Sequence, residues 1–121
     1  GTRLSSFLNG VKVADGEREL ATHLGFPGAR WTFPRRCGFD EQRVLGELTR
    51  VAVAARPARL KAVLRVAEDR WLLIQHHGGS LSMRDISWRR DSRIELVFPP
   101  GSAPDWSAWD ALWERSMPRA A

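Results

Sequence analysis

Residues 59–77 read RLKAVLRVAEDRWLLIQHH and decide the fold of this chain. In their first half, apolar side chains occupy every second position, at Leu60, Ala62, Leu64 and Val66. Because side chains alternate between the two faces of a strand, this period predicts a strand with one buried face. Residues 68–70 are charged and suit a turn, and residues 71–76 then return as a second strand that begins apolar on both faces. The stretch therefore predicts an antiparallel pair of strands.

Two further strands are expected along the chain, over residues 81–86 and 93–98. Gly78 and Gly79 precede the first of them and allow the positive φ angles of a tight turn. In the second, Ile94, Leu96 and Phe98 share one side of the strand. Connections this short predict that the strands form an antiparallel meander.

One helix is expected before these strands in the chain and one after them. Asp40 and Asp105 are good N-caps, and a short strand over residues 30–33 precedes the first helix. The apolar residues of the two helices recur at helical spacing, at Val44, Leu45, Leu48, Val51 and Ala52 and at Trp106, Trp109 and Trp113. This order predicts an α+β fold, a four- to five-stranded mainly antiparallel sheet with helices packed on one face.

Residues 1–30 are expected to be a connecting segment with short helices, followed by one domain over residues 31–121. Leu4, Phe7, Leu8 and Val11 have helical spacing, and residues 17–24 suit a second short helix because Leu20 and Leu24 lie one turn apart. The chain opens Gly1-Thr2 rather than with Met, so we expect it to be a piece of a longer protein.

Composition narrows the function classes. The apolar runs are far shorter than the roughly 20 residues that a membrane helix needs, and no signal peptide is recognisable. The lone Cys37 agrees with a cytoplasmic location. The net charge of +5 could favour a polyanion, but the arginines are scattered, so nucleic acid is a disfavoured partner and no membrane partner is expected.

Four stretches resemble the C-terminal domain of CobW-type GTPases. They are Phe39-Asp40 before the first helix, 59–65 (RLKAVLR), 88–96 (WRRDSRIEL) and Asp105-Trp106 before the last helix. They follow one another with the order and spacing typical of the family. Ala62 departs from the family's usual glycine.

The resemblance implies a role for the chain beside a GTPase. Parent proteins of this family hydrolyse GTP with Mg²⁺ and deliver zinc or cobalt to a client metalloprotein. The phosphate loop and the metal motif belong to the GTPase half, and neither is found in this sequence. The resemblance therefore implies an accessory domain that docks the missing N-terminal GTPase domain and recognises the client, without a cofactor of its own.

No catalytic or metal site is predicted. Cys37 follows two arginines, which can lower a thiol pKa, but the sequence supplies no base or oxyanion hole to go with it. His76 and His77 are the weak metal candidates, and as neighbours in a strand they should point to opposite faces.

A partner-binding surface is the remaining hypothesis. Its predicted residues are Lys61, Arg65, Trp88, Arg89 and Arg93. Cations beside an exposed Trp suit a docking surface, whereas cross-strand pairing with acids is the structural alternative. The alternative function is a free-standing basic binding module for nucleic acid or a protein partner. A small hydrolase built on Cys37 is a third reading.

Overall fold

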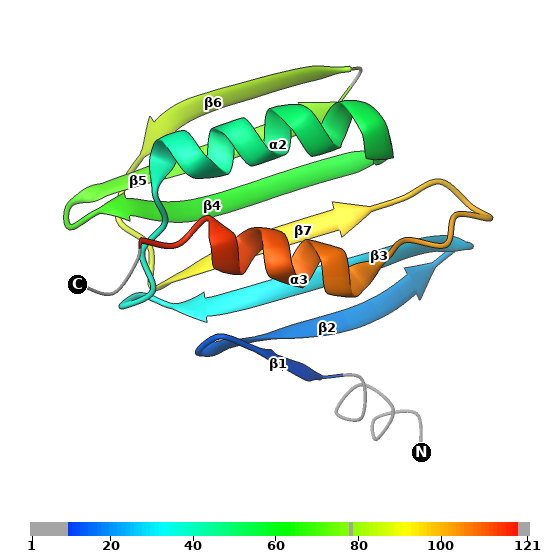
Figure 1. Cartoon of the computed structure of the whole chain (residues 1–121), viewed down its shortest axis with the longest axis horizontal. Coiled ribbons are helices and arrows are strands. Elements are labelled where there is room, and N and C mark those ends of the chain that lie inside the picture. The colour runs from blue at the N-terminus through cyan, green and yellow to red at the C-terminus, as the bar shows by residue number, and fades with distance from the viewer. Residues whose placement is uncertain (1–9, 78, 119–121) are drawn as a thin grey trace.

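All seven strands that the structure describes pair antiparallel in one sheet, and both helices lie over the same face of it (Figure 1). This computed structural model describes residues 10–77 and 79–118. The strands are β1 (Val11–Val13), β2 (Gly16–His23), β3 (Phe26–Pro34), β4 (Arg59–Ala67), β5 (Arg70–His77), β6 (Ser80–Ile86) and β7 (Asp91–Val97). The helices are α2 (Glu41–Ala55) and α3 (Trp106–Arg115). The predicted α+β class, with an antiparallel sheet, is confirmed.

Strands β4 and β5 follow the predicted alternation. Leu60, Ala62 and Leu64 of β4 are 1% exposed or less and face the helices. On β5, Leu72 and Ile74 share that side, while Trp71 and Leu73 are buried on the opposite side of the sheet. The expectation that this strand begins apolar on both faces is therefore confirmed.

The meander prediction is correct for β4, β5 and β6 and wrong for β7. The strand order across the sheet is β1-β2-β3-β7-β4-β5-β6, so β7 lies between β3 and β4. Ile94 is fully buried there between Trp31 of β3 and Ala62 of β4. A strand with such an apolar side gains more burial in the middle of the sheet than at an edge beside β6. Residues 87–90 therefore pass the ends of β5 and β4 on their way from β6 to β7.

The sheet has seven strands rather than four or five because the N-terminal segment adds strands. The short helix expected over residues 17–24 is wrong, since those residues pair with β3 from Glu17 opposite Thr32 to His23 opposite Phe26. Leu24, read as one turn of helix from Leu20, is in the β2–β3 turn and is 83% exposed. Of the helical stripe expected at Leu4, Phe7, Leu8 and Val11, the first three residues lie outside the described residues, and the prediction is wrong for Val11, which lies in β1.

Both predicted N-caps are confirmed. Asp40 accepts a hydrogen bond from the Arg43 backbone N–H at 3.0 Å, and Asp105 accepts one from Ala108 at 3.1 Å. Neither α2 nor α3 is long and apolar enough to cross a membrane. The caps fix where each helix starts, and the apolar faces of the helices then form one core with residues of β3, β4, β5 and β7.

A buried ion pair ties α3 to the N-terminal strands. Arg18 of β2 donates from Nη1 to Asp110 Oδ2 at 2.7 Å, and Trp31 of β3 donates from Nε1 to Asp110 Oδ1 at 2.7 Å. The side chains of Arg18 and Asp110 are only 9% and 13% exposed. One carboxylate therefore holds two strands and one helix together.

Candidate functional site

The predicted partner-binding residues lie on or beside the sheet face that neither α2 nor α3 covers, called here the open face. Lys61 and Arg65 project from β4 on this side, because Leu60, Ala62 and Leu64 occupy the other. Val63 of β4 lies opposite Arg93 of β7, so the two strands are neighbours. Trp88 and Arg89 belong to the connection over residues 87–90.

Opposite charges alternate across the middle of the open face. The register places Glu19, Arg30, Glu95 and Lys61 in one row over four neighbouring strands. Arg30 Nη2 lies 3.4 Å from Glu19 Oε2. Cross-strand neighbours of opposite charge stabilise a sheet and leave little net field. Lys61 therefore lies in a balanced row, which favours the structural reading for this residue.

Arg93 is also occupied by a neighbour. It donates from Nε to Asp91 Oδ1 at 2.8 Å, and this hydrogen bond raises the pKa of Arg93. The pair is on the exposed side of β7, where solvent weakens it. Lys61 and Arg93 thus fit the local ion-pair pattern of the sheet better than a binding role.

Arg65 and Trp88, by contrast, meet in a hollow of about 520 Å³, called here the Trp88 hollow. It is lined by Pro34, Arg35, Arg36, Arg65, Glu68, Asp69 and Trp88. The Trp88 side chain is 60% exposed, which confirms the expectation of an exposed Trp beside the cations. A large aromatic side chain left in water beside charged groups is typical of a binding surface.

The Trp88 hollow is held in shape by three arginines. The Arg35 guanidinium lies 5.6 Å from the centre of the Trp88 ring, a cation–π contact. Arg65 donates to the backbone oxygens of Arg35 at 2.8 Å and Ala67 at 3.2 Å. Arg89 donates to the oxygens of Ser87 at 2.9 Å and Trp88 at 3.2 Å. The hydrogen bonds hold the backbone around Trp88, and the Arg35 contact restrains the ring itself, which lowers the entropy cost of binding.

The other charged residues of the hollow were not among the predicted partner-binding residues. Arg35 and Arg36 follow β3, whereas Glu68 and Asp69 lie in the β4–β5 turn, so the fold brings together segments about 30 residues apart. Each pair follows the end of a strand, and these strand ends lie at the same end of the sheet. Cations and anions both line the hollow, and a protein surface with mixed charges suits it better than a uniform polyanion.

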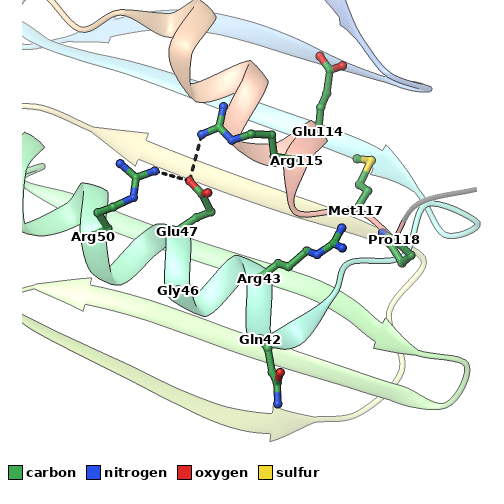
Figure 2. A pocket seen from close by; sticks show the side chains of 9 residues that line it. All are labelled: Gln42, Arg43, Gly46, Glu47, Arg50, Glu114, Arg115, Met117 and Pro118. Atoms are coloured by element: carbon green, nitrogen blue, oxygen red, sulfur yellow. Dashed lines mark hydrogen bonds and ion pairs between the residues drawn. The ribbon is translucent and has the colours of Figure 1, made fainter.

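Another hollow, with a volume of about 620 Å³, lies between α2 and the end of α3 (Figure 2). Glu47 accepts hydrogen bonds there from Arg50 at 2.7 Å and from Arg115 at 3.0 Å. The bond from Arg115 contributes most to lowering the pKa of Glu47. Gly46 of α2 also lines the hollow, beside this ion-pair network. The network fastens the two helices to each other, which accounts for these side chains without a ligand.

The weak metal candidates diverge as expected. His76 is 8% exposed on the helix side of β5, with its Nδ1 unpaired, whereas His77 is exposed. Within residues 10–77 and 79–118, no three His, Cys, Asp or Glu side chains gather in a way that could hold a metal. Cys37 is half-buried, and burial, followed by the charge of Asp15, raises the pKa of its thiol. Arg36 lowers the pKa of this thiol by less than burial and Asp15 raise it.

Three comparisons test the chain against known proteins. Models of protein families, curated proteins and solved structures give no match. The class of this protein is therefore defined by its own fold, an antiparallel seven-stranded sheet with two helices on one face. Its function has to be argued from its residues.

Proposed function

We propose that this chain is an accessory domain of a CobW-type GTPase metallochaperone. In this role it docks the GTPase half and recognises the metalloprotein that receives zinc or cobalt. GTP and Mg²⁺ belong to the GTPase half, and the domain itself works in the cytoplasm by binding. The proposal rests on the resemblance of four sequence stretches, and its warrant is one of analogy.

The observation that carries the proposal is how three of these stretches meet. The Phe39 backbone N–H donates to the Arg65 oxygen at 2.8 Å, and the Arg65 N–H donates to the Ser92 hydroxyl at 3.1 Å. Ser92 is fully buried, and its hydroxyl satisfies an amide just beyond the point where β4 and β7 stop pairing. The residue types of the resemblance thus have a joint physical task at one junction.

The same junction borders the Trp88 hollow. Arg65 belongs to both, and Trp88 opens the stretch that contains Ser92. A partner that pushes on the hollow therefore acts close to the hydrogen bonds that join β4, β7 and the start of α2. Such proximity suits a domain whose contacts differ between two nucleotide states, as coupling between GTP and client binding requires.

A protein partner fits the hollow better than nucleic acid, the alternative function. Phosphate binding depends on a net positive surface, because each neutralised phosphate contributes through counterion release. Glu68 and Asp69 line the hollow opposite the arginines and oppose such binding. An exposed indole among charges of both signs is typical of a protein-binding hot spot.

The test is a titration of this chain with a CobW-type GTPase domain that lacks its own C-terminal domain, in GDP and in GTP with Mg²⁺. We expect binding whose dissociation constant differs at least tenfold between the nucleotides. Trp88→Ala should weaken it at least tenfold, because hot-spot truncations cost about 2 kcal/mol or more. Leu24→Ala, a change at another exposed side chain in the distant β2–β3 turn, is the matched control.

Two outcomes would overturn the proposal. One is the absence of binding in both nucleotide states, and the other is equal binding by wild type and Trp88→Ala. A parallel titration with a single-stranded oligonucleotide separates the alternative. Affinity that falls about a thousandfold or more from 50 to 200 mM salt would favour a nucleic-acid module.

A further inference from the structure

Strand β6 forms one edge of the described sheet, and the charges of Arg84 and Asp85 are its main protection as an edge. Its seven residues, SLSMRDI, pair without interruption with β5, from His77 opposite Ser80 to Trp71 opposite Ile86. It contains no proline, no lysine and no bulge, which are common devices against strand addition. The opposite edge strand, β1, has only three residues. Within the part of the chain that the structure describes, nothing pairs with the outer side of β6 (Figure 1).

Two of the three β6 side chains on the helix side of the sheet are apolar, and the third is Asp85. Leu81 and Met83 lie opposite His76 and Ile74 of β5 and so share the helix side of the sheet. Leu81 is half-buried, and Met83 is 49% exposed although it lies next to the core. Another strand along β6 would cover both side chains and pair the free backbone groups.

A second copy of the chain is the occupant that these side chains fit. A two-fold axis perpendicular to the sheet keeps the helices of both copies on one side, so residues of the same face must lie opposite each other. If the axis passes at Ser82, Leu81 lies opposite Met83 of the second copy, and Ser80 lies opposite Arg84. The two strands then overlap over residues 80–84. Within this overlap each apolar side chain meets an apolar one, and no two like charges face each other.

Three other registers are worse. An axis at Leu81 leaves Met83 opposite Gly79 of the second copy, outside β6. An axis at Met83 places the apolar Leu81 opposite Asp85 of the second copy. An axis at Arg84 places the two Arg84 side chains opposite each other, and like charges in that position destabilise a sheet. The residue pattern of β6 thus favours the axis at Ser82 over these three.

We propose that two copies of this chain associate through β6 in antiparallel pairing about a two-fold axis at Ser82. The two sheets then continue as one, and the open faces of both copies remain uncovered. The Trp88 hollow is not part of the pairing, so the dimer and the docking role are independent.

Cysteine cross-linking tests the register. In a Cys37→Ser background, Ser82→Cys places two thiols directly opposite each other, with Cα atoms about 4.5–5.5 Å apart, which a disulfide can span. Oxidation should give a covalent dimer on a non-reducing gel. Met83→Cys in the same background is the control, because its two copies are diagonal neighbours about 7–8 Å apart and should remain largely unlinked. Efficient linking of Met83→Cys but not of Ser82→Cys would overturn the proposed register.

Sedimentation equilibrium tests the interface itself without new cysteines. We expect wild type to dimerise and Met83→Lys to raise the dissociation constant at least tenfold, because a charge replaces the apolar contact. Val11→Lys is the matched control, since Val11 is also an exposed apolar residue on an edge strand, β1. A monomeric wild type at all concentrations would overturn the proposal, as would a dimer that Val11→Lys dissociates and Met83→Lys does not.

Discussion

Replacement of Asp110 by alanine should remove a large part of the stability of this domain. The change leaves the Arg18 guanidinium, whose side chain is only 9% exposed, without its counterion. It also leaves the Trp31 N–H without the acceptor that lies 2.7 Å away. Loss of one partner of a buried ion pair typically costs about 3–5 kcal/mol. Since a small domain has about 5–15 kcal/mol in total, the variant should be close to unfolding.

The pair itself need not be strongly stabilising, and a second variant separates the two effects. Arg18 Nε is buried without a partner, so the ion pair does not recover the whole cost of burying its charges. The double variant Arg18→Met, Asp110→Leu should therefore recover most of the loss. Asp110→Asn should fall between, because its amide oxygen can still accept the bond from Trp31.

Urea unfolding followed by tryptophan fluorescence measures all three variants. The free energy of unfolding should fall. The m-value should stay the same, because it depends on the surface exposed on unfolding and the substitutions barely change that surface. A loss below about 1 kcal/mol for Asp110→Ala would refute the reasoning. It would mean that water reaches Arg18 in solution and that the carboxylate is not the element that joins β2, β3 and α3.

Two further predictions concern single side chains. Gly46→Ala should raise the free energy of unfolding by about 0.5–1 kcal/mol, because Gly46 lies inside α2 with nothing within 4 Å of the added Cβ. Gly16→Ala, its matched control in urea unfolding, should destabilise the domain, because the new Cβ would lie 2.2 Å from the Thr32 oxygen; equal effects would contradict both statements. Alkylation of Cys37 should reach half its maximal rate at a higher pH than that of free cysteine, because burial and the Asp15 charge disfavour the thiolate. Asp15→Asn should lower that midpoint, and a wild-type midpoint at or below that of free cysteine would contradict the reasoning.

Patterns of period two and the helix caps were sufficient to predict β4, β5 and both helices. These elements depend on neighbours within a few residues, such as the alternation from Leu60 to Val66 and the bond from Arg43 to Asp40. Strand order is different in kind. Nothing local distinguishes a β7 beside β6 from a β7 between β3 and β4, because the gain comes from contacts of Ile94 with residues far away in the sequence.

The N-terminal strands were missed for a related reason. Leu20 and Leu24 have helical spacing, and only the pairing with β3 overrides it. Arg18 in particular occupies a buried position of β2 where an apolar residue would be expected, because Asp110, 92 residues later, compensates its charge. Strand propensity depends on how well a side chain fits its neighbours in the sheet, and these neighbours could not be predicted from the local sequence.

The candidate site divides along the same line. Exposure of Trp88 was predicted, since it stands beside a run of arginines, and Arg65 was placed on the correct face. Arg35 and Arg36 became part of the site only because β3 and the β4–β5 turn end at the same side of the sheet.

Exposed apolar surface indicates where this domain has partners. The structure describes five large exposed apolar side chains, Val11, Leu24, Phe26, Met83 and Trp88. The row of alternating charges from Glu19 to Lys61 on the open face leaves little net field there to attract a charged partner. Trp88 differs from the other four because the cation–π contact with Arg35 restrains its ring at the edge of a charged hollow. Met83 differs because it lies on a long edge strand with unpaired backbone groups. A partner gains most from a side chain whose position is already ordered. The indole at the hollow is therefore the site at which recognition of a different protein is expected, and β6 is the site at which the chain is expected to recognise itself.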